Sequence, residues 1–239
     1  MAICHQRTVP DSKADTKKEI IMVTSLRIAL ILAVVGLLMA VPPVYTEPRQ
    51  HSTSQLWTFP DTDVVADAES KLTRRDNEIC MRIHTRGLTE GAYTIWWFVF
   101  NNPEHCTSPL PVGDARCGGD DDFANPEVNL AALWATGGIV GPDGIGHFSA
   151  CLEENTFPGQ KLDDGPGLTD AQGAEIHLAV RSHCAVEYGE PALLRAQLTM
   201  FGGGCTETGG EALGPLGTCD CTNPQFAIHP LTKRQHEDD

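Results

Sequence analysis

Alternation of apolar and polar residues constrains the fold of this chain most strongly. Residues 175–182, EIHLAVRS, place three aliphatic side chains on one side of an extended chain and polar groups on the other. Residues 78–85, EICMRIHT, alternate in the same way. Residues 92–101, AYTIWWFVFN, are apolar on both sides, which is typical of a strand covered on both faces. All three stretches are therefore predicted to be β-strands.

The remaining segments fit a chain of short strands joined by irregular loops. Residues 133–152 read as a hairpin around a Gly-Pro-Asp-Gly turn, and residues 225–230 as a short closing strand. Residues 125–133 are predicted to begin a short helix capped by Asn125, and residues 191–201 fit a helix or a strand equally well. We predict an all-β fold: an antiparallel β-sandwich or jelly-roll-like domain with long Gly/Pro/Asp loops stapled by disulfides.

The N-terminal region indicates export. Residues 28–41 form an uncharged apolar run of the length of a signal-peptide core, shorter than a spanning helix requires. We predict a leader and signal peptide over 1–46 with Met22 as the true start, a single β-sandwich domain over 47–230, and a disordered acidic tail over 231–239. An uncleaved leader is the alternative, and it is the one route by which we expect membrane attachment.

The charge of the chain argues against one class of partner. Beyond residue 46 it carries 12 Lys and Arg against 29 Asp and Glu, so its net charge is 12 − 29 = −17. Such a surface repels a phosphate backbone, so nucleic-acid binding is not expected. The same acidity disfavours adhesion to anionic lipid.

The number of cysteines also indicates export. Eight of the nine follow the leader, at positions Cys80, Cys106, Cys117, Cys151, Cys184, Cys205, Cys219 and Cys221. An even number in an exported chain indicates disulfides. Local spacing predicts a Cys106–Cys117 bridge and a bridge from Cys205 to Cys219 or Cys221, while the pairing of the other three stays open. A structural zinc site is the competing interpretation, but no C-x-x-C knuckle is present.

Histidines provide one candidate metal site. His177 and His183 share a face of one predicted strand, but six residues of extended chain separate them by roughly 20 Å, too far to share an ion. His84 and His147 lie at outward positions on other predicted strands. A cross-strand zinc or copper site of His84, His147 and His177 is therefore one hypothesis. The alternative is three solvated histidines with local hydrogen bonds.

A run of carboxylates provides a second candidate. Asp120, Asp121 and Asp122 lie in the loop GGDDDF, and oxygen-rich loops of this kind suit calcium. Adjacent residues converge on an ion poorly, so a solvated turn, or a cap for the segment at Asn125, is the alternative. The sequence contains no G-x-S-x-G, H-E-x-x-H or phosphate-binding Gly-Lys loop, and we assign no catalytic residue and no cofactor.

Several stretches in combination resemble a known group of proteins. Residues 91–106 (GAYTIWWFVFNNPEHC), 139–148 (IVGPDGIGHF), 173–183 (GAEIHLAVRSH), 201–205 (FGGGC) and 225–229 (QFAIH) are similar to a family of exported bacterial all-β proteins with no assigned activity. The resemblance implies a secreted, disulfide-containing β domain and supplies no catalytic residues. Three cysteines fall outside the family pattern: Cys80, Cys151 and Cys184. A further similarity, to the CHRD domains of extracellular proteins, is an analogy only.

These observations lead to one functional expectation with two alternatives. We expect an exported, non-enzymatic binding or structural module of the periplasm, cell envelope or extracellular space, with an unknown partner. The first alternative is a metalloprotein that uses the histidine site. The second is an adhesion module stabilised by calcium at the 114–122 loop.

Overall fold

A computed structural model describes residues 49–206 and 219–231, and it confirms the all-β prediction. The elements of these residues are β1 (Gln50–Thr58), β2 (Val64–Arg75), β3 (Glu78–Thr85), β4 (Gly91–Phe100), the 3-10 helix η1 (Pro103–His105), α2 (Asp120–Ala124), the 3-10 helix η2 (Pro126–Val128), β5 (Leu130–Val140), β6 (Gly146–Glu153), β7 (Glu175–Ser182), α3 (Pro191–Thr199) and β8 (Thr222–His229). The predicted leader (1–46), with Met22 as its start, and all but the first residue of the predicted tail (231–239) lie outside the described residues.

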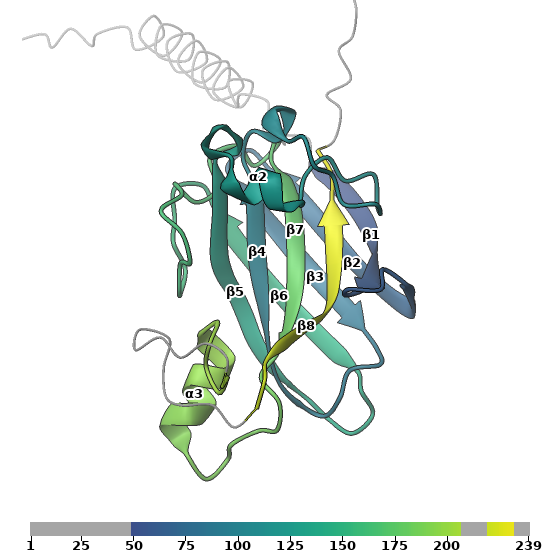
Figure 1. The fold of residues 1–239 in the computed structure, drawn as a ribbon, viewed down its shortest axis with the longest axis vertical. Coiled ribbons are helices and arrows are strands. Elements are labelled where there is room, and N and C mark those ends of the chain that lie inside the picture. The colour runs from purple at the N-terminus through teal and green to yellow at the C-terminus, as the bar shows by residue number, and fades with distance from the viewer. Residues whose placement is uncertain (1–48, 207–218, 232–239) are drawn as a thin grey trace, which may run out of the picture. The chain divides into compact units, whose positions relative to one another are not determined.

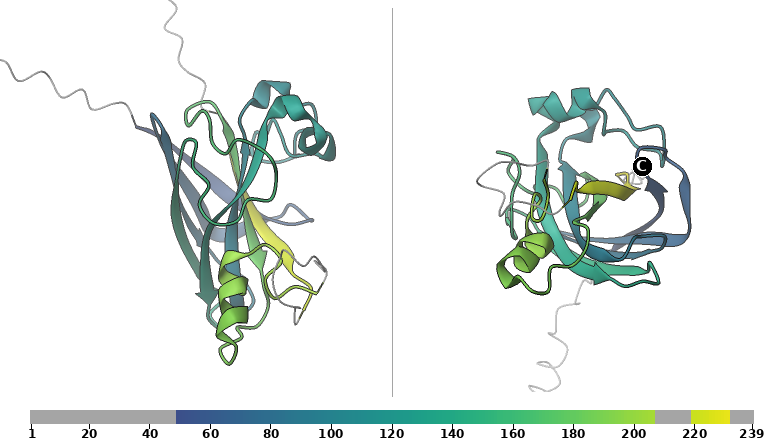
Figure 2. Two further views of the ribbon diagram at one scale, coloured as in Figure 1. Left: turned by 90° about the vertical axis from the view of Figure 1, so that its left-hand side faces the viewer. Right: turned by 60° about the horizontal axis from the view of Figure 1, so that its bottom comes forward.

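All eight strands belong to one antiparallel sheet (Figure 1), in the order β5-β4-β7-β8-β1-β2-β3-β6. The sheet curls until its two end strands, β5 and β6, contact each other, and the right-hand view of Figure 2 shows it nearly closed. Opposite parts of the curved sheet face each other across the core, as the two layers of a sandwich do.

The core lies inside this curved sheet and follows the predicted alternation. Ile79, Met81 and Ile83 of β3 point inward and are buried, while the residues between them point outward. β4 is covered on both faces, as predicted: Trp97 belongs to the core, and Trp96 packs edge-on against Phe201 on the other side. Burial of such side chains is the main favourable term in folding.

The structure shows which elements form in the segments that the sequence pattern left ambiguous, and it contains two strands that the pattern did not predict. Residues 191–201 contain the helix α3, and Asn125 caps the short helix η2 by accepting a hydrogen bond from the backbone N–H of Glu127. β5 then starts at Leu130. Strands β1 and β2 were not predicted.

Four disulfides join the described cysteines. Cys106–Cys117 confirms the predicted local bridge, and Cys205 pairs with Cys221, one of its two predicted partners. The cysteines left open pair as Cys80–Cys151 and Cys184–Cys219. No helix within residues 49–206 and 219–231 is long and apolar enough to cross a membrane. Multiple disulfides are consistent with export, because thiols oxidise stably outside the cytoplasm.

Candidate functional site

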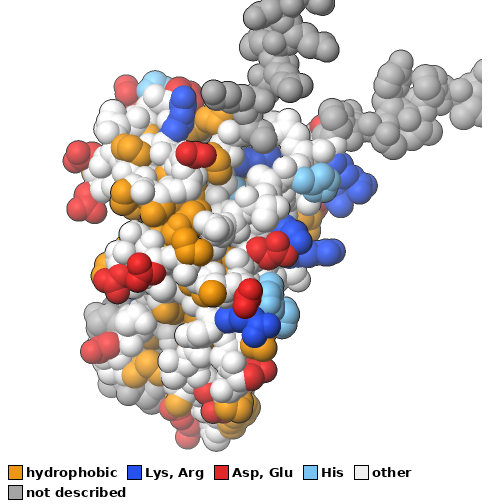
Figure 3. All heavy atoms as spheres, turned by 90° about the vertical axis from the view of Figure 1, so that its right-hand side faces the viewer, with side chains coloured by type: hydrophobic (Ala, Val, Ile, Leu, Met, Phe, Trp, Pro, Cys, Tyr) orange, Lys and Arg blue, Asp and Glu red, His pale blue; other side chains and the backbone are white. Residues whose placement is uncertain are grey.

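The outer face of β1, β2, β3 and β6 is unusually rich in basic side chains for this acidic chain. We call it the basic face and define it by the residues Arg49, His51, Lys71, Arg75, Arg82, His84 and His147. The alternation that buries Ile79, Met81 and Ile83 turns Cys80, Arg82 and His84 outward. In Figure 3, Lys, Arg and His side chains gather towards the right of the view, and Asp and Glu are more frequent towards its left.

Strand register places two of the cations directly opposite each other. Lys71 of β2 and Arg82 of β3 are Cα partners on the outer face, and both are exposed. Like charges in this position destabilise a sheet unless something neutralises them. Lys71 donates to Glu69, with Nζ 2.6 Å from Oε1. The Arg82 side chain makes no hydrogen bond or ion pair with the described residues, so its guanidinium is available to a ligand.

The basic face is hollowed along these residues. Two adjoining hollows of about 750 and 500 Å³ both include Lys71, Arg82 and Ser149 in their walls. The Cys80–Cys151 disulfide lines the larger hollow, and the two facing histidines line the smaller. Together the hollows form an open groove across four strands.

Two of the three histidines predicted to form a metal site are neighbours at one end of this groove. His84 and His147 are Cα partners on β3 and β6. Their rings are stacked, with centroids 4.6 Å apart and planes inclined by 29°. Their Nδ1 atoms lie 3.3 Å from each other. This pair is partly exposed to solvent and open to an ion.

The third predicted ligand, His177, does not join them. It lies on β7, which β8, β1 and β2 separate from β3 in the sheet. Its ring packs at 4.7 Å, centroid to centroid, against Phe100, and its Nε2 lies 2.8 Å from Oε1 of Glu175. The expectation of a solvated polar face here is wrong: His177 and Glu175 are both buried. The loop between Cys106 and Cys117 covers them.

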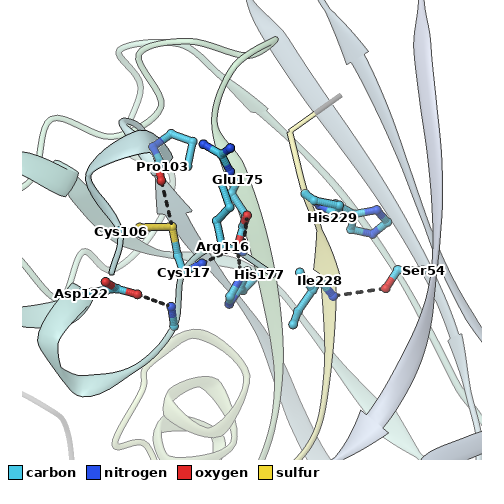
Figure 4. Close-up of polar contacts among 12 residues, drawn as sticks. Ser54, Pro103, Cys106, Arg116, Cys117, Asp122, Glu175, His177, Ile228 and His229 are labelled. Atoms are coloured by element: carbon cyan, nitrogen blue, oxygen red, sulfur yellow. Dashed lines mark hydrogen bonds and ion pairs between the residues drawn. A yellow bond between two sulfur atoms is a disulfide. The ribbon is translucent and has the colours of Figure 1, made fainter. Parts of the chain in front are cut away.

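Figure 4 shows how this loop is fastened to β7. The Glu175 carboxylate accepts hydrogen bonds from the backbone N–H groups of Arg116 and Cys117 at 3.0–3.1 Å, in addition to its contact with His177. A buried carboxylate with several donors is well satisfied. We therefore interpret Glu175 and His177 as a structural clamp for the disulfide-closed loop.

The three aspartates of the predicted calcium loop form the short helix α2. Asp122 is buried, and its carboxylate accepts hydrogen bonds from the backbone N–H groups of Thr107, Ser108 and Gly118. Asp120 and Asp121 are exposed. Asp122 therefore stabilises the loop from within, and no hydrogen bond links the three carboxylates within the part of the chain described.

A polar layer inside the core was not visible in the sequence. His229 is fully buried between two serines, with Nδ1 2.9 Å from Ser52 Oγ and Nε2 2.8 Å from Ser70 Oγ. Arg74, also buried, donates to the backbone carbonyl of Ala171 at 2.8 Å, and burial lowers its pKa to about 10. Because these groups have no access to solvent, they serve the fold rather than a ligand.

A second buried histidine lies beside a disulfide. His183 Nδ1 is 3.7 Å from the Sγ atoms of both Cys205 and Cys221 and 2.6 Å from the carbonyl of Gly203. Since the two sulfurs are bonded to each other, they are not free to ligate a metal.

Comparison of the chain with protein-family models, with curated proteins and with solved structures finds no match. The family resemblance noted in the sequence therefore stays a prediction, and the function has to be argued from the basic face.

Proposed function

We propose that this protein is an exported, non-enzymatic binding module that holds a carboxylate- or sulfate-bearing ligand on its basic face. The observation that carries the proposal is the direct opposition of Lys71 and Arg82, with the Arg82 guanidinium making no hydrogen bond or ion pair among the described residues. An oxyanion between these two side chains would relieve their repulsion and receive charge-assisted hydrogen bonds.

The shape of the groove favours an extended ligand. Lys71 and Arg75 lie four residues apart on β2, roughly 13 Å along the strand, and Arg82 lies beside Lys71 on β3. Exposed hydroxyls of Thr53 and Ser149 flank these cations in the same walls. Spaced cations among hydroxyl groups suit an acidic polysaccharide, whose charges repeat along a chain rich in hydroxyls.

The acidity of the whole chain does not oppose a ligand of this kind. At physiological ionic strength, charges are screened beyond about 8 Å, so a narrow ligand in the groove senses mainly the local cations. A wide duplex would also contact the acidic surroundings, which is why nucleic acid stays disfavoured. The four disulfides support a location in the periplasm, the cell envelope or the extracellular space.

The proposal is tested by measuring binding of polygalacturonate and dextran sulfate, with uncharged dextran as the reference polymer. The wild-type protein is expected to bind at least one charged polymer, with an affinity that decreases as the salt concentration rises. It is expected not to bind dextran. Arg82→Ala is expected to weaken binding about tenfold, because one charge-assisted hydrogen bond is lost.

The matched control is Arg195→Ala, which removes the same side chain from an exposed position on α3. It should bind as the wild type does. Equal weakening by the two substitutions, or equal binding of charged and uncharged polymers, would remove the basic face as the site.

A further inference from the structure

The facing Nδ1 atoms of His84 and His147 are close enough to share a proton or to bind one cation between them. Their Nδ1 atoms are 3.3 Å apart across the β3–β6 pair. Each neutral imidazole has one nitrogen with a lone pair and one with a proton. Two lone pairs at this distance repel each other, and so do two protons. The contact is favourable when one ring donates its Nδ1 proton to the lone pair of the other, or when a cation binds between the two lone pairs.

The separation fits a metal ion. Two imidazole nitrogens bound to zinc at about 2.0–2.1 Å in tetrahedral geometry lie about 3.3–3.4 Å apart. The observed Nδ1 separation of 3.3 Å agrees with this value. Because the two rings are stacked, each has to rotate about its side-chain bonds to point its in-plane lone pair at the ion, but the strands need not move. The cross-strand register therefore holds two ligands at the spacing that a tetrahedral ion requires.

A candidate third ligand lies on the neighbouring strand, with its carboxylate directed at Lys71 in this structure. Glu69 of β2 is the Cα partner of His84, so Glu69, His84 and His147 form one row across three strands on the same outer face. Side chains in such a row have their Cβ atoms about 4.5–5.5 Å apart. All three line the smaller hollow of the groove.

The Glu69 carboxylate is free to turn towards the histidines. Its side chain is 47% exposed, and its one described ion pair is the surface contact with Lys71. Surface ion pairs of this kind contribute little to stability, so replacing the contact with a metal bond has a small cost.

We propose that His84, His147 and Glu69 form a binding site for a divalent transition-metal ion, zinc in the first instance. Two imidazoles and one carboxylate are donors that zinc accepts readily, whereas calcium and magnesium require oxygen ligands. The site differs from the histidine set predicted from the sequence in that Glu69 takes the place of His177. It does not depend on anion binding by the same face.

The test is calorimetric titration of ZnCl₂ into the disulfide-bonded protein, purified without a polyhistidine tag and with no anionic polymer present. The wild type is expected to bind one zinc ion per chain. His84→Ala and His147→Ala should each weaken binding by about a hundredfold, and Glu69→Gln by about tenfold. Histidine side-chain NMR should show zinc-dependent shifts at Nδ1 of both rings.

Three control variants make the result specific. His51→Ala removes another exposed histidine of the basic face, and His177→Ala removes the buried ligand that the sequence predicted. Both should bind zinc as the wild type does. Arg82→Ala should keep zinc binding while it weakens polygalacturonate binding, which separates this proposal from the proposed function. Melting curves of all variants confirm that they fold.

Two outcomes would overturn the site. One is a wild-type protein that takes up no zinc at stoichiometric concentration. The other is a His84→Ala or His147→Ala variant that binds zinc as tightly as the wild type.

Discussion

His229 is a buried group whose ionisation differs strongly from its ordinary state. Desolvation, followed by the positive charge of Arg74 and the influence of His177, lowers its pKa from 6.5 to about 3. The folded protein therefore holds a neutral ring between Ser52 and Ser70 at every pH above about 3. In the unfolded chain the same ring takes up a proton below pH 6.5.

This difference predicts acid sensitivity. Between pH 6.5 and about 3 the unfolded chain binds a proton at His229 that the folded protein does not, so stability falls as pH falls through this window. The loss is on the order of a few kcal/mol. In melting curves recorded from pH 7 to pH 4, His229→Gln should be less stable than the wild type at pH 7 but lose less stability on acidification. An exposed control, His51→Ala, should keep the wild-type slope. Equal slopes for His229→Gln and the wild type would contradict the assignment.

Glu175 is the second residue whose burial has a measurable consequence. Its carboxylate accepts from Arg116 N, Cys117 N and His177 Nε2. Glu175→Gln keeps the shape but replaces one acceptor oxygen by a donor, which leaves buried N–H groups without a partner. We expect a loss of about 1–3 kcal/mol in urea unfolding. Glu104→Gln, at an exposed position on η1, should change stability little. A loss at Glu175 no larger than that at Glu104 would contradict its role as a clamp.

Among the elements, α3 depends on a glycine of β5 for its position. The Leu198 carbonyl at the end of α3 approaches Gly137 so closely that a Cβ there would overlap it, and the same carbonyl accepts a hydrogen bond from Trp134 Nε1 at 3.0 Å. Gly137 is thus a point of close approach between α3 and β5.

We therefore expect Gly137→Ala to displace α3 and to lower the free energy of unfolding by about 1–3 kcal/mol, the usual cost of overpacking. Urea denaturation measures this loss. Gly141→Ala is the matched control, because a Cβ at Gly141 meets only the Asp143 carboxylate at 3.6 Å, an ordinary contact. Similar effects of the two substitutions would show that the approach of α3 is not the cause.

The same elements show what the sequence pattern could reveal. The strands over 78–85 and 175–182 are found at their predicted bounds, because apolar side chains alternate along both. β1 and β2 were missed, because several of their inward residues are polar, including Ser54, Ser70 and Arg74. Polar residues at inward positions interrupt the alternation of apolar and polar side chains by which a strand is recognised in a sequence.

For the residues of the candidate site, too, the sequence predicted some features, and others depend on the three-dimensional fold. Outward positions for His84 and His147 followed from alternation, but their register followed only from the pairing of β3 with β6. Burial of His177 depends on a loop that folds back from residues 106–117, and local alternation carries no information about such a cover. Glu69 was missed because β2 was missed.

At the scale of the whole molecule, the disulfides are the most direct test of the fold. Peptide mapping of the unreduced protein should recover Cys80–Cys151, Cys106–Cys117, Cys184–Cys219 and Cys205–Cys221. Replacing both Cys80 and Cys151 by alanine opens a loop of 71 residues, for which the chain-entropy model gives a loss of about 4 kcal/mol. A Cys205–Cys219 bridge, or free thiols in exported protein, would contradict this arrangement.

The seam where the sheet nearly closes has a further consequence. Beside β5, the chain from Gln160 to Leu162 exchanges backbone hydrogen bonds with Trp134 and Ala132, at 2.9 Å each, and Asp163 also bonds to Ala132 N. An edge strand with unsatisfied amides is a template on which other chains can add. Here that template is already occupied along part of its length, and β6 lies close by. The β5 edge therefore offers fewer unpaired backbone groups to a strand from another chain.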